Sequence, residues 1–122
     1  MKDLFKNFIK TQIILLTLVC VHTASAQFVP QNEAEEQAAK LVQAYQSEVG
    51  MTIEQASAVY AKIVEVIAKE NSIRNSKATE EQKKKSLMDL SKEETKHMST
   101  ILDSKQFKEY KKMKERLQPM GL

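Results

Sequence analysis

The side chains best suited to chemistry lie around His97, which follows Glu93 by four residues and Glu94 by three. On a helix these spacings place the carboxylates beside the imidazole, a combination that can supply metal ligands. Zinc takes three or four protein ligands, and no further histidine or cysteine lies within reach along the sequence. We therefore predict that His97 is a surface histidine and that the chain has no metal site.

No other grouping of residues is typical of an active site. The chain has 122 residues, with two glycines and two prolines. It contains no Ser–His–Asp set, no glycine-rich phosphate loop and no paired carboxylates tied to a pocket. We predict that the protein is not an enzyme and uses no cofactor.

Methionines and lysines are the remaining candidates for contact with a partner. Methionine adapts to varied surfaces, and clustered lysines attract acidic ones. Residues 82–122 hold 11 basic and 6 acidic residues, a net charge of +5, whereas residues 27–81 carry −4. The binding candidates are Met88, Met98, Met113, Lys111, Lys112 and Lys114. The simpler alternatives are methionines that fill gaps in a small core and lysines on a solvated helix face.

Residues 1–26 have the pattern of a cleaved secretory signal. Lys2, Lys6 and Lys10 precede an apolar run from Ile13 to Val21, and Ala24-Ser25-Ala26 supplies small residues for cleavage. The run is far shorter than the roughly 20 residues that span a bilayer. The alternatives are an uncleaved anchor and acylation of the single cysteine, which lacks the small preceding residue that acylation needs. We predict cleavage after residue 26, a mature domain of residues 27–122 and a periplasmic location.

Export bears on the choice of partner for the lysine-rich half. It argues against nucleic acid and favours an acidic polypeptide, with an anionic lipid surface as an alternative.

The composition predicts an all-α fold, because residues that favour helices are abundant and turn residues are scarce. Four helix starts are marked by a capping residue followed three positions later by Glu or Gln. The pairs are Asn32/Glu35, Thr52/Gln55, Thr79/Gln82 and Asp103/Gln106. Gly50 ends the first helix and Pro119 follows the fourth, while residues 27–31 form a loose arm.

Each predicted helix carries an apolar stripe at helical spacing. The stripes are Ala34, Ala38, Leu41, Tyr45 and Val49 in the first helix; Leu87, Leu90, Met98 and Ile101 in the third, interrupted by Glu94; and Phe107, Tyr110 and Leu117 in the fourth, with Met113 at the edge. The second helix has two stripes, one of Ile53, Ala56, Tyr60, Ile63 and Ile67 and one of Val59, Ile63, Val66 and Ile73. So wide an apolar arc makes this helix central in a monomer or places it against a second chain. Because the core is small, we favour a homodimer.

Two of the helix starts share a longer pattern: an apolar residue, a capping residue, two variable positions and glutamine. They are Met51-Thr52-x-x-Gln55 and Leu102-Asp103-x-x-Gln106. The apolar residue is placed to contact the fourth helical residue, and the glutamine to bond the backbone of the cap. Each cap stabilises its helix by about 1 kcal/mol.

With this repeated motif, the chain resembles the Spy/CpxP family of periplasmic proteins, which is marked by two Leu-Thr-x-x-Gln motifs. Met51 stands for Leu in the first copy and Asp103 for Thr in the second, and the resemblance covers roughly residues 48–118. It implies an all-helical, antiparallel, cradle-shaped homodimer with a role in the stress response. Zinc binding by some relatives is not carried over, because residues 27–122 contain only one histidine and no cysteine.

The resemblance also implies ATP-independent, chaperone-like binding of unfolded polypeptides in the envelope. The alternatives are a signalling modulator that binds the periplasmic domain of a sensor kinase, and a structural helical adaptor.

Overall fold

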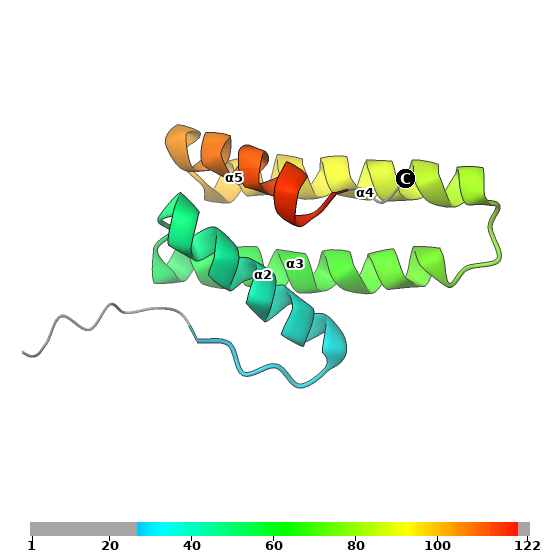
Figure 1. Ribbon diagram of the computed structural model, residues 1–122, viewed down its shortest axis with the longest axis horizontal. Helices are drawn as coiled ribbons and strands as arrows, with labels where there is room; N and C mark the ends of the chain where they lie inside the picture. The colour runs from blue at the N-terminus through cyan, green and yellow to red at the C-terminus, as the bar shows by residue number, and fades with distance from the viewer. Residues whose placement is uncertain (1–26, 120–122) are drawn as a thin grey trace, which may run out of the picture.

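The computed structural model describes residues 27–119, which form four α-helices and no strand (Figure 1). The helices are α2 (Glu33–Val49), α3 (Ile53–Arg74), α4 (Glu80–Ile101) and α5 (Ser104–Leu117). The prediction of an all-α fold with four helices is confirmed. The predicted signal peptide, with Cys20 and the cleavage site, lies outside the described residues, as does Met120.

The helices begin where the capping pairs predicted. Complete capping boxes with Gln at the third helical position stand at Thr52, Thr79 and Asp103. Asn32 also caps its helix, but Glu35 bonds the backbone N–H of Gln31 and the Asn32 side chain instead of completing a box.

Gly50 ends α2 in the left-handed conformation, with φ of 72°. Side chains other than glycine adopt this conformation at a cost, so the residue fits the tight turn between α2 and α3.

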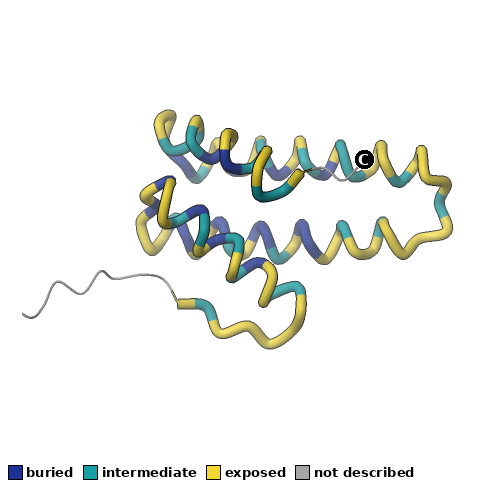
Figure 2. The backbone as a smooth tube through the Cα atoms, viewed as in Figure 1, coloured by how far each residue is buried: buried dark blue, intermediate teal, exposed yellow. Residues whose placement is uncertain are grey.

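Neighbouring helices surround a shared interior. α3 and α4 form an antiparallel hairpin, α2 packs along α3, and α5 packs along α4 and α2. The hairpin is longer than either covering helix, so its end around residues 74–85 extends beyond α2 and α5 (Figure 1). Buried residues gather where the four helices meet, and the hairpin end is largely exposed (Figure 2).

Most of both apolar stripes of the central helix is covered within one chain; Ile53, the first residue of one predicted stripe, is instead 44% exposed. Val59, Ile63 and Val66 are buried, and α2 and α4 are the helices that contact α3. Of the two alternatives for this helix, the structure supports the one in which α3 is central in the monomer. The wide apolar arc of α3 therefore gives no argument for a second chain. Val42, which the predicted stripe omitted, is also fully buried.

The core extends further than the stripes predicted. Residues 27–31 were expected to form a loose arm, but Phe28 stacks on Tyr60 of α3 with ring centroids 4.1 Å apart. Lys62 is only 8% exposed and donates to Glu93 of α4 at 2.9 Å, a bond that raises the pKa of Lys62. Polar side chains thus take part in helix contacts that apolar periodicity alone does not reveal.

Candidate functional site

The two glutamines of the repeated motif meet where the α2–α3 and α4–α5 junctions lie next to each other, at the end of the bundle opposite the α3–α4 turn. Gln55 Nε2 donates to Gln106 Oε1 at 2.8 Å, and Gln106 Nε2 donates to Gln55 Oε1 at the same distance. Each amide also donates to the carbonyl that precedes the other motif: Gln55 to Ile101 and Gln106 to Gly50, both at 3.1 Å. The α2–α3 and α4–α5 junctions are therefore joined by a reciprocal set of hydrogen bonds.

This contact gives the motif residues a structural role. Met51 and Leu102 are buried beneath the two junctions, while Thr52 and Asp103 accept from the backbone N–H of Gln55 and Gln106. The third capping box, Thr79/Gln82, has the same local geometry, but its hydrogen bonds stay within its own helix start. A large apolar side chain before the cap, Met51 or Leu102 where the third box has Ala78, marks the two sequence copies that form the cross-link.

We expect Gln55→Ala to lower the free energy of unfolding by about 2 kcal/mol, because it leaves the Ile101 carbonyl, the Thr52 N–H and part of the Gln106 amide without partners. Gln82→Ala is the matched control and should cost only about 0.5–1 kcal/mol, the value of a local cap. Urea unfolding of both variants measures the difference. Equal losses would show that the link between the junctions contributes no stability.

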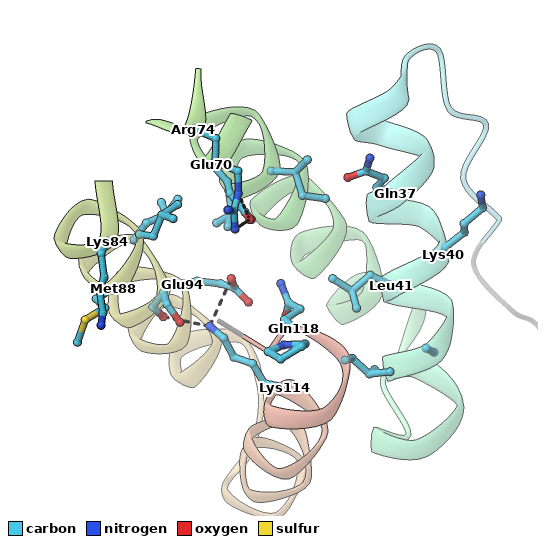
Figure 3. A pocket seen from close by; sticks show the side chains of 18 residues that line it. Gln37, Lys40, Leu41, Glu70, Arg74, Lys84, Met88, Glu94, Lys114 and Gln118 are labelled. Atoms are coloured by element: carbon cyan, nitrogen blue, oxygen red, sulfur yellow. Dashed lines mark hydrogen bonds and ion pairs between the residues drawn. The ribbon is translucent and has the colours of Figure 1, made fainter. Parts of the chain in front are cut away.

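The four helices line an open cavity of about 540 Å³, and neither glutamine of the cross-link belongs to its lining (Figure 3). Its walls are mainly aliphatic, and every helix contributes to them. The apolar lining consists of Leu41, Ala44, Val66, Ile67, Leu87, Met88, Leu90, Leu117 and Pro119. A cavity of this size and character falls in the range of small-molecule sites, about 300–1,000 Å³.

A charged pair lies at the inner end of the cavity. Glu94 of α4 is 1% exposed; its Oε1 accepts from the Tyr110 hydroxyl at 2.6 Å, and its Oε2 lies 3.3 Å from Lys114 Nζ (Figure 3). Lys114 also donates to the Ser91 carbonyl and to Thr95 Oγ1 at 3.0 and 3.1 Å. The glutamate that interrupted the predicted stripe is therefore a fully partnered core residue.

Burial perturbs the titration of this network. It lowers the pKa of the Lys114 ammonium, against the opposing attraction of Glu94. It raises the pKa of Tyr110 far above its usual value, and the charge of Glu94 adds to the shift. Burial likewise raises the pKa of Tyr45, whose hydroxyl donates to Gln118 Oε1 at 2.6 Å and whose ring lies 5.1 Å from that of Tyr110.

The predicted binding residues divide between the core and the surface. Met98 and Met113 are buried, as in the alternative in which methionines fill gaps in the core, and Met88 lines the cavity. Lys114 belongs to the internal network, which differs from the expectation of a surface cation. Lys111 and Lys112 are exposed.

The exposed side of α5 carries a row of lysines. Lys105, Lys108, Lys111 and Lys112 are all exposed along this helix. Lys111 Nζ lies 5.0 Å from the ring centre of the half-buried Phe107, a distance typical of a cation–π contact. This face thus offers positive charge next to an aromatic ring.

The residues around His97 do not converge. Glu93 pairs with Lys62 and Lys69 of α3, whereas Glu94 points into the core and His97 is exposed. Within residues 27–119 no group of three His, Cys, Asp or Glu side chains could hold a metal ion. None of the helices between those residues has the length and hydropathy needed to cross a membrane.

Comparisons with known proteins give no relative: no family model matches the chain, and neither a curated protein nor a solved structure does.

Proposed function

We propose that the chain is an exported, chaperone-like protein that binds unfolded polypeptides without ATP through the lysine-rich face of α5. The observation that carries the proposal is the row of exposed lysines on that helix, with Phe107 beneath Lys111. Unfolded chains expose apolar groups and charges together. Positive charge attracts acidic segments at long range, and the aromatic ring adds an apolar contact at short range.

The proposed location depends on the signal-like pattern of residues 1–26. In an envelope compartment without ATP, capture and release must follow from surface chemistry alone. The sequence resemblance to the Spy/CpxP family supports the same activity and an antiparallel, cradle-shaped homodimer. The end of the α3/α4 hairpin around residues 74–85, which α2 and α5 leave uncovered, is the surface we propose for the second chain.

We expect the mature protein, in several-fold excess, to suppress light scattering by a chemically denatured client in the absence of ATP. Suppression should be stronger for acidic clients and should weaken with added salt, because attraction between exposed charges is screened over about 10 Å at 0.1 M. The same preparation should have the mass of two chains in solution.

The decisive variant replaces Lys108, Lys111 and Lys112 with Glu, which reverses the α5 face without touching the internal Lys114. The matched control makes the same charge change at Lys40, Lys92 and Lys96, which are exposed on α2 and α4 outside the hairpin end. Only the α5 variant should lose suppression of an acidic client, with the helix content of both unchanged. Unchanged scattering at every ratio with wild-type protein would refute the proposal and leave the signalling modulator or adaptor.

A further inference from the structure

The cavity between the four helices has the features of a ligand site separate from the α5 surface. Its lining contains aliphatic side chains and no aromatic one, so it offers flexible walls to an alkyl chain and no ring face on which a planar ligand can stack. We propose that this cavity binds a single-chain carboxylate of the fatty-acid type, with its tail between the helices and its carboxylate at the hairpin end.

The charges along the cavity give the ligand a direction. At the inner end, the Glu94 carboxylate is already matched by Lys114 and the Tyr110 hydroxyl. A second carboxylate at that end would lie against Glu94 in a poorly solvated place, where like charges repel strongly. The head of an anionic ligand is therefore excluded from the inner end.

The opposite end is positive. Arg74 of α3 and Lys84 of α4 line it, together with Glu70 of α3, whose carboxylate is matched by Arg74. Residues 74–85, which form the hairpin end, hold five basic and two acidic residues. Arg74 uses Nε and one Nη to bind Glu70 at 3.0 and 2.7 Å, which leaves three of its five N–H groups. Within residues 27–119, Lys84 makes no ion pair, so its ammonium is available to a carboxylate.

Gln37 of α2 also lines the cavity, whereas Gln118 lies next to Glu94 and Lys114 (Figure 3), and its Oε1 accepts from the Tyr45 hydroxyl. Lys40 contributes less, because its ammonium pairs with Glu36 at 2.7 Å and points away from the cavity in Figure 3. Aliphatic walls, a neutralised inner end and a cationic opening together favour an anionic amphiphile over a neutral or cationic one.

The test is calorimetric titration of the mature protein with dodecanoate below the concentration at which it forms micelles. Dodecanol and dodecylammonium, which have the same chain with a neutral or a positive head, serve as comparators. We expect saturable binding of one dodecanoate per chain, at least about tenfold tighter than dodecylammonium. Equal affinity for all three, or uptake that does not saturate, would overturn the proposal.

Two variants and one control locate the site. Lys84→Glu should weaken dodecanoate binding about fivefold, whereas Lys85→Glu, the next exposed residue on α4 but not part of the lining, should change it less than about twofold. Ala44→Leu, which adds a branched side chain to the cavity wall, should weaken binding of dodecanoate and dodecanol alike. Equal effects of Lys84→Glu and Lys85→Glu would refute the assignment even if Ala44→Leu failed to fold.

The outcome is independent of the proposed chaperone activity. Lys84→Glu should leave suppression of client aggregation intact, because Lys84 is not on α5; since Lys84 lies in the hairpin end proposed for the second chain, the mass of this variant in solution is measured as well. The mass in solution should be measured with and without dodecanoate. If dodecanoate binds only after a two-chain assembly is diluted to single chains, the cavity belongs to the second chain and the ligand proposal is wrong.

Discussion

Lys114→Met should lower the free energy of unfolding by about 3 kcal/mol at neutral pH. Removing one partner of a buried ion pair leaves the other charge uncompensated, which costs about 3–5 kcal/mol in proteins. We expect the lower end of that range because the Lys114 side chain is 12% exposed and water can reach part of the site. Urea unfolding followed by circular dichroism measures the loss.

Lys112→Met is the matched control on the same helix. Lys112 pairs with Glu109 at 3.0 Å, but both side chains are largely exposed, so the expected loss is below about 0.5 kcal/mol. A similar loss in the two variants would show that the buried pair with Glu94 contributes no more to the free energy of unfolding than the exposed pair with Glu109.

The double variant Glu94→Gln/Lys114→Met separates the cost of an unpaired buried charge from the cost of losing the other contacts of the Lys114 side chain. The glutamine oxygen can still accept from Tyr110, and its amide nitrogen can donate to the Ser91 carbonyl that Lys114 no longer reaches. Because no unpaired charge remains, the double variant should recover at least about half of the loss. No recovery would mean that Lys114 acts mainly through its bonds to Ser91 and Thr95.

The helix starts could be predicted from the sequence because each depends on four consecutive residues. Thr52, Thr79 and Asp103 each accept from an N–H three positions later, and that geometry is set locally. The cross-link between Gln55 and Gln106 could not be predicted in this way, since it joins residues 51 positions apart. Its one trace in the sequence is the large apolar side chain before each of these two caps, where the third cap is preceded by alanine.

Glu94 shows a second limit of apolar periodicity. A carboxylate in an apolar stripe indicates a weak core only if it stays unpartnered, and its partners here lie on α5, 16 and 20 positions further along the chain. The same limit applies to Lys114, which composition placed on a basic surface although the fold turns it inward. The spacing of residues within one helix does not tell which face of another helix its side chains will contact.

Stability should fall steeply above pH 10, because Tyr45 and Tyr110 are buried as neutral phenols. Burial raises the pKa of both in the folded state, whereas in the unfolded chain each ionises near its usual pKa of about 10. Above that pH the folded state holds more protons than the unfolded state, so stability decreases as pH rises. The expected slope is about 1.4 kcal/mol per pH unit for each tyrosine, or roughly 2.7 for the two.

The other perturbed groups partly offset one another in this range. The raised pKa values of Lys62, Lys69 and Tyr60 add to the alkaline loss, since the protonated forms are favoured by folding and that contribution disappears as pH rises through the folded pKa. The lowered pKa of Lys114 acts in the opposite direction, because the unfolded chain binds its proton more tightly and stability from this group increases with pH. Tyr45 and Tyr110, whose pKa values are raised furthest, should therefore contribute most of the net slope.

The measurement is the free energy of unfolding between pH 8 and 11, together with the tyrosinate absorbance of the folded protein, which has three tyrosines in all. Tyr45→Phe/Tyr110→Phe should be less stable at neutral pH, since Gln118 and Glu94 lose a hydroxyl donor, but its alkaline slope should be much flatter. Tyr60→Phe, which removes the half-buried tyrosine, is the comparison: burial raises its pKa too, but less than those of Tyr45 and Tyr110, so it should flatten the slope less than the double variant. If Tyr45 and Tyr110 ionise near pH 10 while the helices remain intact, these phenols are not sealed from water and the buried network is open to solvent.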